Sequence, residues 1–196
     1  MTTIKKNNFL LSNKIVNPKK IFNIITDQIP RSIFTILTVD LFNKIIKDKI
    51  LDVFIIKKKN KIASVISVVS NNNYNFLKKK IFFYFLLNPH KLLFNISFIF
   101  AMFDRSSNNI EFSKDKNYLH LLHLVIFKKY FKNISLKKKD EIINFFLAKI
   151  IKKYDAKFFY LCYEKNNIRA FNYYKRNKFK SYAKSKNTIF VKKRIR

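Results

Sequence analysis

Two segments in the first half of the chain repeat their apolar residues at helical intervals. Residues 17–30, NPKKIFNIITDQIP, begin with Asn17 and Pro18, residue types that commonly open a helix, and they end at a second proline. Residues 40–50, DLFNKIIKDKI, have the same spacing of apolar positions. The pattern therefore predicts two helices near the start of the chain.

The stretch that follows has the composition of two strands. Residues 52–70, DVFIIKKKNKIASVISVVS, are rich in β-branched residues, and a polar break at 58–60 divides them. A tight turn of this kind needs a positive φ angle, which glycine adopts most easily. Because the chain contains no glycine, Asn60 is the best candidate for that conformation.

The most apolar part of the chain is the segment 81–103. Pro89 and its polar neighbours divide this segment into apolar runs of 7 and 12 residues. Neither run reaches the roughly 18–20 residues of a membrane-spanning helix, so we expect two helices that meet at Pro89. Burial against the domain is the simplest interpretation of their apolar surface. Peripheral membrane contact and a partner interface are the alternatives.

In the second half of the chain, strand patterns and helix patterns alternate. Residues 118–127 and 156–164 have the pattern of buried strands, 136–154 and 167–177 that of helices, and 179–193 that of a closing hairpin. In the longer helix, the lysines and the aspartate are expected to lie opposite an apolar stripe that consists of Ile142, Ile143, Phe146, Ile150 and Ile151. This alternation predicts an α/β fold.

The chain is strongly basic, with a formal net charge of +31 from 42 Lys and Arg against 11 Asp and Glu. One interpretation is a partner that carries phosphates, either nucleic acid or an anionic membrane surface. The other is codon bias, because Lys, Asn, Ile and Phe dominate while Gly and Trp are absent, as an A/T-rich genome would produce. The even spread of lysines along the chain favours codon bias.

The single cysteine, Cys162, excludes a disulfide framework and a cysteine-rich zinc site, and we expect no metal site. It lies in the apolar run KFFYLCYE, so we expect a buried, unreactive thiol. The first 14 residues lack the long apolar core of a signal peptide. We therefore expect a cytoplasmic protein.

A set of residues at fixed intervals joins the strand at 156–164 to the helix that follows it. Two strand positions precede an Asn, a small residue, a Tyr and a Phe at fixed intervals. This spacing resembles the late motif of the GNAT (Gcn5-related) N-acetyltransferase superfamily, in which a glycine precedes the last aromatic residue. The positions that match are Leu161, Tyr163, Asn167, Ala170, Tyr174 and Phe179, and Lys178 takes the place of the glycine.

The resemblance implies a single acetyltransferase domain over residues 1–196. Its fold would be a central, mixed, twisted sheet with a splayed strand and with helices on both faces. Residues 118–182 would form the acetyl-CoA-binding core, and residues 74–103 an apolar helical insertion. The co-substrate would be acetyl-CoA and the acceptor a primary amine. Such a transfer needs a site for the thioester oxyanion, a base for the amine and a proton for the departing thiolate.

The resemblance also assigns roles to three residues of the motif. Tyr174 would lie near the CoA sulfur and give it a proton, because a phenol is a neutral donor at pH 7. Asn167 and Ala170 would contact the arm of the cofactor. Taken alone, Asn167 is also a good helix cap and Tyr174 an ordinary core aromatic. Their joint spacing favours the functional interpretation.

The strand at 118–127 is expected to be the splayed strand of the family. The pattern HLLHLVI resembles Glu-Leu-Leu-x-x-x-Val of bacterial members, and His120 would take the place of the glutamate, which can act as a general base. His123 is the rival, and the offset of three residues puts the two histidines on opposite faces of a regular strand. Both can also be structural histidines. Backbone N–H groups of Leu124, Val125 and Ile126 would face the thioester oxygen.

The family binds the CoA pyrophosphate with a glycine-rich loop at a helix N-terminus. The corresponding stretch here, KKYFKNISLKKKDE, contains no glycine. We expect Lys132, Asn133, Ser135 and Lys137 to form the phosphate cradle in its place. The lysines 137–139 would otherwise be a solvated helix start, where positive charge opposes the helix dipole and a bound anion would relieve that cost.

The function expected from these residues is transfer of an acetyl group to a small-molecule amine. The insertion at 74–103 resembles that of bacterial members associated with cell-surface sugar biosynthesis, which implies an amino sugar as acceptor. Two alternatives are an inactive relative that serves as an interaction protein and a basic module that binds RNA or ribosomes. The oligomeric state is open and includes a homodimer.

Overall fold

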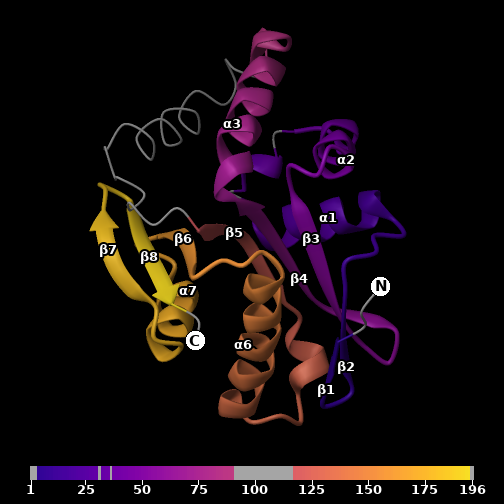
Figure 1. The fold of residues 1–196 in the computed structure, drawn as a ribbon, viewed down its shortest axis with the longest axis vertical. Helices are drawn as coiled ribbons and strands as arrows, with labels where there is room; N and C mark the ends of the chain where they lie inside the picture. Colours follow the sequence, from indigo (N-terminus) through magenta and orange to yellow (C-terminus); the bar gives the residue numbers. More distant parts are fainter. Residues whose placement is uncertain (1–3, 31, 36, 91–116, 195–196) are drawn as a thin grey trace.

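The computed structural model describes residues 4–30, 32–35, 37–90 and 117–194. Eight strands form one open sheet in the order β1-β2-β3-β4-β5-β6-β8-β7 (Figure 1). The strands are β1 (Ile4–Lys6), β2 (Phe9–Ser12), β3 (Asp52–Lys58), β4 (Lys61–Ser70), β5 (Tyr118–Ile126), β6 (Phe158–Glu164), β7 (Lys180–Lys184) and β8 (Thr188–Arg194). All neighbours pair antiparallel except β5 and β6, which are parallel. The sheet is therefore mixed, as the sequence predicts.

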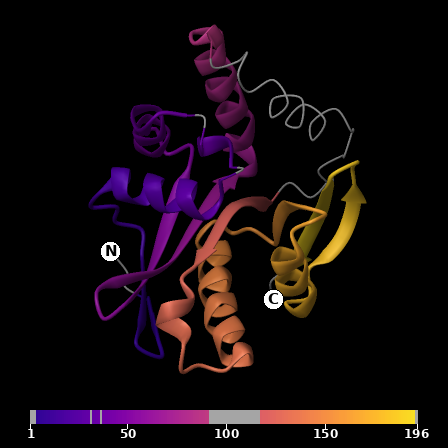
Figure 2. The same ribbon diagram turned by 180° about the vertical axis from the view of Figure 1, so that it is seen from behind.

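Helices cover both faces of this sheet (Figures 1 and 2). One face carries α1 (Pro18–Gln28), the 3-10 turn η1 (Ile33–Thr35), α2 (Val39–Lys47) and α3 (Asn71–Leu86). The other carries the 3-10 turn η2 (Lys128–Phe131), α6 (Leu136–Lys153) and α7 (Ile168–Arg176). Alternation along each strand explains the two cores: in β3, Phe54 and Ile56 face α6, while Val53 and Ile55 face α1 and α2. The α/β fold with helices on both faces is thus confirmed.

Most elements occur where the apolar pattern predicts them. The exceptions are β1 and β2, a hairpin that the sequence analysis missed, and α3, which begins at Asn71, ten residues before the apolar segment at 81–103. The second helix expected after Pro89 lies mostly outside the described residues. Within the described part of the chain, no helix is long and apolar enough to cross a bilayer.

The apolar stripe of α6 is buried as expected, but Asp140 does not lie on the solvated face. Only 7% of Asp140 is exposed, and its Oδ2 accepts a hydrogen bond from Nε of Arg176 at 2.7 Å. The expectation was wrong because it considered α6 alone. Helix α7 packs beside α6 and supplies a cation, and burying a carboxylate without such a partner would be costly.

Tight turns in this glycine-free chain use other residues in the left-handed conformation. Positive φ angles occur at Asn7, Asn8, Lys49, Lys59, Asn60, Asp155 and Lys178. Asn60, with φ 59°, confirms the prediction for the β3–β4 turn, and its neighbour Lys59 shares the conformation. Asn7 and Asn8 form the equivalent β1–β2 turn, and this Asn-Asn pair is the signal that could have revealed the missed hairpin.

Helix α7 ends in a Schellman motif centred on Lys178, whose φ is 60°. The N–H of Phe179 donates to the carbonyl of Tyr174 at 2.9 Å, and the N–H of Lys178 donates to that of Lys175 at 3.1 Å. The motif requires a left-handed residue at the Lys178 position. This requirement gives a physical reason for the glycine that the GNAT family has there.

Replacing Lys178 by glycine is expected to stabilise the protein. The left-handed conformation costs a residue with a Cβ roughly 1–2 kcal/mol, and the extra freedom of glycine in the unfolded chain offsets part of that gain. We predict that Lys178→Gly raises the free energy of unfolding by about 0.5–1 kcal/mol, measured by urea denaturation. The matched control, Lys175→Gly in the helical part of α7, should lower it by about 0.5–1 kcal/mol. Equal losses in both variants would contradict the assignment of strain to Lys178.

Candidate functional site

The parallel strands β5 and β6 part after a short paired region. Their register pairs are Tyr118 with Phe158, Leu119 with Phe159, and His120 with Tyr160. Beyond these pairs, β5 continues to Ile126 on β4, and β6 continues to Glu164 on β8. In the described part of the chain, the register therefore does not join β5 to β6 beyond His120 and Tyr160. The splayed strand that the sequence analysis expected at 118–127 is present.

A β-bulge in β5 follows directly after the paired region. Ser67 of β4 is opposite His123, and the next residue, Val68, is opposite Leu121, so Leu122 has no partner on β4. A bulge bends the strand that carries it and increases its twist. This bend explains why β5 leaves β6 at this point.

The bulge also corrects the expected orientation of the two histidines. His120 stacks on Tyr74 of α3 with ring centroids 3.8 Å apart, and His123 lies 4.8 Å from the Phe34 ring of η1. Both therefore point to the face covered by α1, α2 and α3. The prediction of opposite faces was wrong because it assumed a regular strand, whereas one bulged residue reverses the alternation.

His123 is held by hydrogen bonds at both ring nitrogens. Its Nε2 lies 2.6 Å from Oγ of Ser32, and its Nδ1 lies 2.7 Å from Oγ of Ser67. Burial lowers the pKa of His123 to about 3. A neutral imidazole with both nitrogens engaged has no free position for a substrate proton, so these contacts favour the structural interpretation of His123.

His120 lies at the last paired position before β5 and β6 part. It is 4% exposed, and burial, with a smaller effect of the Lys78 ammonium, lowers the pKa of His120 to about 3. The ring is therefore neutral at physiological pH. The role of His120 as a general base stays a prediction. Its imidazole is a much weaker base than an exposed imidazole.

Tyr174 lies on the other face of the sheet, where α7 packs against β6. Its ring is 5.4 Å from that of Tyr163 on β6 and 5.0 Å from that of Phe179, the residue that follows the Schellman turn. Burial, with smaller effects of Cys162 and Tyr163, raises the pKa of Tyr174 above its ordinary value. The phenol is therefore protonated at neutral pH.

Polar contacts between α6 and α7 fix the position of this tyrosine further. Besides the Asp140–Arg176 pair, Nδ2 of Asn144 donates to Oδ1 of Asn177. Nδ2 of Asn177 in turn donates to the carbonyl of Tyr173 at 2.8 Å. These residues tie the end of α7 to the long helix beneath the sheet.

Cys162 is exposed, which corrects the expectation of a buried thiol. The apolar run that contains it predicted burial on both faces of β6. Alternation places Cys162 two residues beyond Tyr160, on the same face and in the stretch of β6 that has no register pair with β5. The exposed thiol therefore lies beside the opening between the two strands.

Asn167 caps α7, since its Oδ1 accepts a hydrogen bond from the N–H of Ala170 at 3.0 Å. The two residues of the expected cofactor contact are thus bonded to each other at the first turn of the helix. The cap accounts for Oδ1 and leaves the Nδ2 group of Asn167 to other contacts. Asn167 can therefore cap α7 and contact the arm of a cofactor at the same time.

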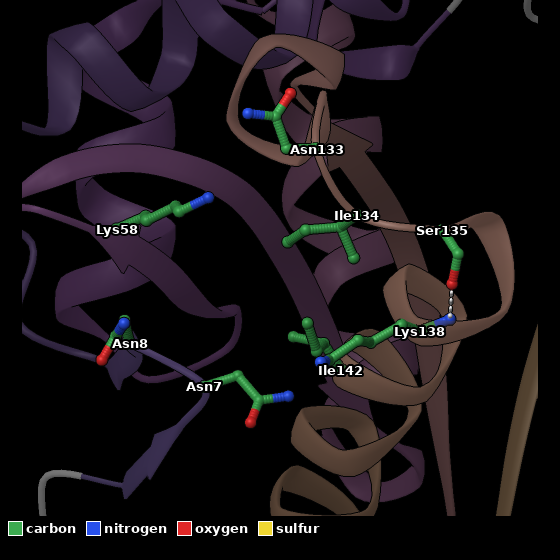
Figure 3. Close-up of a pocket in the computed structure, with 8 residues that line it drawn as sticks. All are labelled: Asn7, Asn8, Lys58, Asn133, Ile134, Ser135, Lys138 and Ile142. Carbon is green, nitrogen blue, oxygen red and sulfur yellow. Dashed lines mark hydrogen bonds between the residues drawn. The ribbon is translucent and has the colours of Figure 1, made fainter.

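The loop that replaces the glycine-rich cradle lines an open pocket of about 390 Å³ at the start of α6 (Figure 3). Ser135 caps the helix, and its Oγ accepts a hydrogen bond from the N–H of Lys138 at 3.3 Å. The pocket brings together two of the predicted loop residues with six others: Asn133 and Ser135 with Asn7, Asn8, Lys58, Ile134, Lys138 and Ile142. No acidic side chain lines it.

The other two predicted loop residues, Lys132 and Lys137, are exposed and do not line this pocket. Sequence reasoning missed the contributions of Asn7, Asn8 and Lys58. Asn7 and Asn8 form the β1–β2 turn and Lys58 ends β3, and only the folded sheet brings these residues to α6. Nζ of Lys58 also donates to the carbonyl of Tyr130 at 2.7 Å.

A tyrosine cluster that the sequence pattern does not predict lies at the opening. Tyr160 lies 4.8 Å from Tyr118 and 5.2 Å from Tyr182, measured between ring centroids. The hydroxyl of Tyr182 is buried and has no hydrogen-bond partner in the described part of the chain. Among the described residues, no three His, Cys, Asp or Glu side chains gather to form a metal site.

Known structures share this fold at low sequence identity. A GNAT-family acetyltransferase from Listeria monocytogenes matches with a TM-score of 0.58 and 12% identity, over 99% of this chain and 100% of that one. N-acetyltransferase PseH from Campylobacter jejuni matches with a TM-score of 0.51 and 14% identity, over 95% and 98% of the two chains.

A third similar structure, PaiA N-acetyltransferase from Thermoplasma acidophilum, is a complex with coenzyme A. Its TM-score is 0.52 at 11% identity, over 95% of this chain and 99% of that one. No protein-family model matches the chain, and neither does any curated protein. The chain thus has the GNAT acetyltransferase fold, as the spacing around Tyr174 predicted.

The two buried histidines make stability depend on pH. Each pKa is about 3 in the folded protein and about 6.5 in the unfolded chain. The stability that the two neutral histidines contribute is therefore fully present above pH 6.5, and it is lost as the pH falls towards 3. Between pH 7 and 5, we predict a loss of about 2 kcal/mol per histidine in the free energy of unfolding.

His123→Gln should remove about half of this dependence of the unfolding free energy on pH, measured by urea denaturation at several pH values. His90→Gln, which changes an exposed histidine, is the matched control variant. A slope that His123→Gln leaves intact would show that His123 is not held in its neutral form.

Proposed function

We propose that the protein is an acetyl-CoA-dependent N-acetyltransferase that acts on a primary amine. The observation that carries the proposal is the opening between β5 and β6 beyond His120 and Tyr160, with Tyr174 packed on β6 beside it. An unpaired strand edge offers N–H and C=O groups to an extended ligand. The amide-containing arm of CoA is such a ligand, and residues 124–126 lie in the stretch of β5 that has no register pair with β6. Because N–H groups alternate along a strand, those of Leu124 and Ile126 would face the opening, whereas that of Val125 faces β4, as the N–H of Phe127 does.

The phosphates of CoA would bind at the start of α6. A helix N-terminus attracts anions through its free N–H groups and its dipole. Ser135 caps this terminus, and Lys58 and Lys138 add positive charge to the pocket that it lines. Side-chain amides of Asn133, Asn7 and Asn8 would donate where glycines would allow close backbone contact. Lys132 and Lys137 would act at longer range, from the solvent side of the same loop.

Tyr174 would assist departure of the CoA thiolate. The amine nitrogen attacks the thioester carbon, the new N–C bond forms, the C–S bond breaks, and the amine releases one proton. Because burial raises the pKa of Tyr174, while a thiol ordinarily titrates near 8.5, full proton transfer from the resting phenol is uphill. We therefore propose that Tyr174 donates a hydrogen bond to the negative charge that develops on the sulfur. The proton that the amine releases then protonates the thiolate.

His120 is the base candidate that the contacts favour over His123. It lies where the strands part, whereas both nitrogens of His123 are bonded to serines. With its low pKa, His120 would accept the amine proton only transiently and pass it on.

For the acceptor, we propose an amine carried on a sugar. The support is the resemblance of residues 74–103 to the insertion of bacterial members linked to surface sugars, and the fold shared with PseH, at a TM-score of 0.51. The tyrosine cluster offers aromatic faces and the unpartnered hydroxyl of Tyr182 on the side of the opening away from α7. Such a surface suits a ring that carries hydroxyl groups. A cytoplasmic location also stays a proposal.

The role of Tyr174 can be tested separately from cofactor binding. Acceptors would first be sought by mass spectrometry with acetyl-CoA and a panel of amino sugars, polyamines and peptides. With the best acceptor, we predict that Tyr174→Phe lowers kcat about 100-fold, because the leaving thiolate loses its donor. Acetyl-CoA affinity, measured by isothermal titration, should change less than about twofold, since the phenol contacts only the reacting end.

Tyr154→Phe is the matched control, because Tyr154 ends α6 far from the loop at its start, and it should retain full turnover. Unchanged turnover in Tyr174→Phe would remove the assigned donor. Absence of acetyl-CoA binding by the unmodified protein at millimolar concentration would overturn the enzymatic proposal itself and favour an inactive relative.

A further inference from the structure

The helix α3 exposes apolar residues on the side that faces away from the protein. Its inner face contains Leu77, Ile81 and Phe85, which are 3–4% exposed. Five residues of α3 and its C-cap are at least half exposed: Phe76 at 59%, Phe82 at 50%, Phe83 at 60%, Leu86 at 57% and Leu87 at 81%. We call these five residues the outer face of α3.

This concentration is unusual within the molecule. The described residues contain nine large apolar side chains that are exposed, and the outer face accounts for five of them. The other four, Val16, Leu136, Ile168 and Phe171, are scattered over three other parts of the chain. Single exposed apolar residues are normal, whereas a contiguous set on one helix indicates an interaction surface. The helix also extends beyond α1 and α2 at one end of the molecule (Figure 1).

Charge indicates what kind of partner covers this face. Lys79 is exposed and lies within one helical turn of Phe76, Phe82 and Phe83. Its two neighbours are engaged elsewhere: Lys80 pairs with Asp48, and Nζ of Lys78 lies 5.0 Å from the Tyr74 ring centroid. The chain as a whole has a formal charge of +31. Two copies of so basic a chain repel each other, so the charge favours an anionic occupant over a second copy.

We propose that the outer face of α3 docks on an anionic lipid bilayer. The phenylalanines and leucines would enter the boundary between head groups and acyl chains, while Lys79 extends to the anionic head groups. The net charge of the domain would attract the protein to the anionic surface. Because Tyr74 in the first turn of α3 stacks on His120, the docked helix would hold the opening between β5 and β6 close to the bilayer. The proposal does not depend on the acetyltransferase assignment.

A tryptophan reporter tests this contact, because the chain contains no tryptophan of its own. The variant Phe83→Trp would be mixed with vesicles of phosphatidylcholine and phosphatidylglycerol, with and without bromine on the acyl chains. We expect a shift of its emission to shorter wavelength and quenching by brominated lipid of about twofold. Val16→Trp, at a residue that is 80% exposed and outside α3, is the control and should show neither change.

A second variant measures the contribution of the apolar face to affinity. Phe83→Ser combined with Leu87→Ser should weaken binding to the anionic vesicles about tenfold at physiological salt, in a sedimentation assay. Equal affinity of this variant and the unmodified protein would show binding by charge alone and overturn the proposal. Equal binding to pure phosphatidylcholine would do the same. A shift of Phe83→Trp emission that follows protein concentration without vesicles would assign the face to a second copy instead.

Discussion

The parallel pairing of β5 with β6 is limited to three residue pairs, and the arrangement of the candidate site depends on that limit. The limit has a local cause in the bulge at Leu122, which bends β5 away from its neighbour. Both strands stay firmly held on their outer sides, by β4 and by β8. All eight strands therefore belong to one sheet, and the sheet opens between β5 and β6 near its centre. Tyr174, Cys162, His120 and the tyrosine cluster all derive their surroundings from this opening.

The absence of glycine raises the question of how the chain makes its tight turns. Among the residues that the structure describes, seven, all of them Asn, Asp or Lys, adopt positive φ angles in its place. Asn and Asp tolerate this conformation better than most residues, and lysine accepts a strain of roughly 1–2 kcal/mol. At Lys178 the strained turn is also functional in our account, because it closes α7 and packs Phe179 against the ring of Tyr174. The loop before α6 also lacks glycine, and it has the small polar residues Asn133 and Ser135 in the stretch that resembles the glycine-rich loop of the family.

The sequence predicts the regular part of this structure well, because periodicity depends on neighbours along one element. The strands β3 to β8 and the helices α1, α2, α6 and α7 all follow from apolar spacing, and the spacing from Leu161 to Phe179 indicates the fold family. The errors arise where distant elements meet. Asp140 is buried because α7 supplies Arg176, the histidines share a face because of a bulge, and Cys162 is exposed in the stretch of β6 that has no pair with β5. The contribution of Asn7, Asn8 and Lys58 to the pocket likewise depends on long-range sheet pairing.

The reactivity of Cys162 tests the opening and its proposed ligand together. This residue is the only cysteine in the chain and is exposed beyond the paired region of β6. Alkylation by iodoacetamide under native conditions, followed by intact-mass spectrometry, reports on it directly. The account predicts ready alkylation of the free protein, strong protection by saturating acetyl-CoA and no protection by equimolar inorganic phosphate. A thiol that is unreactive in the free protein, or one that reacts equally fast with acetyl-CoA present, would contradict the claim that the cofactor lies between β5 and β6.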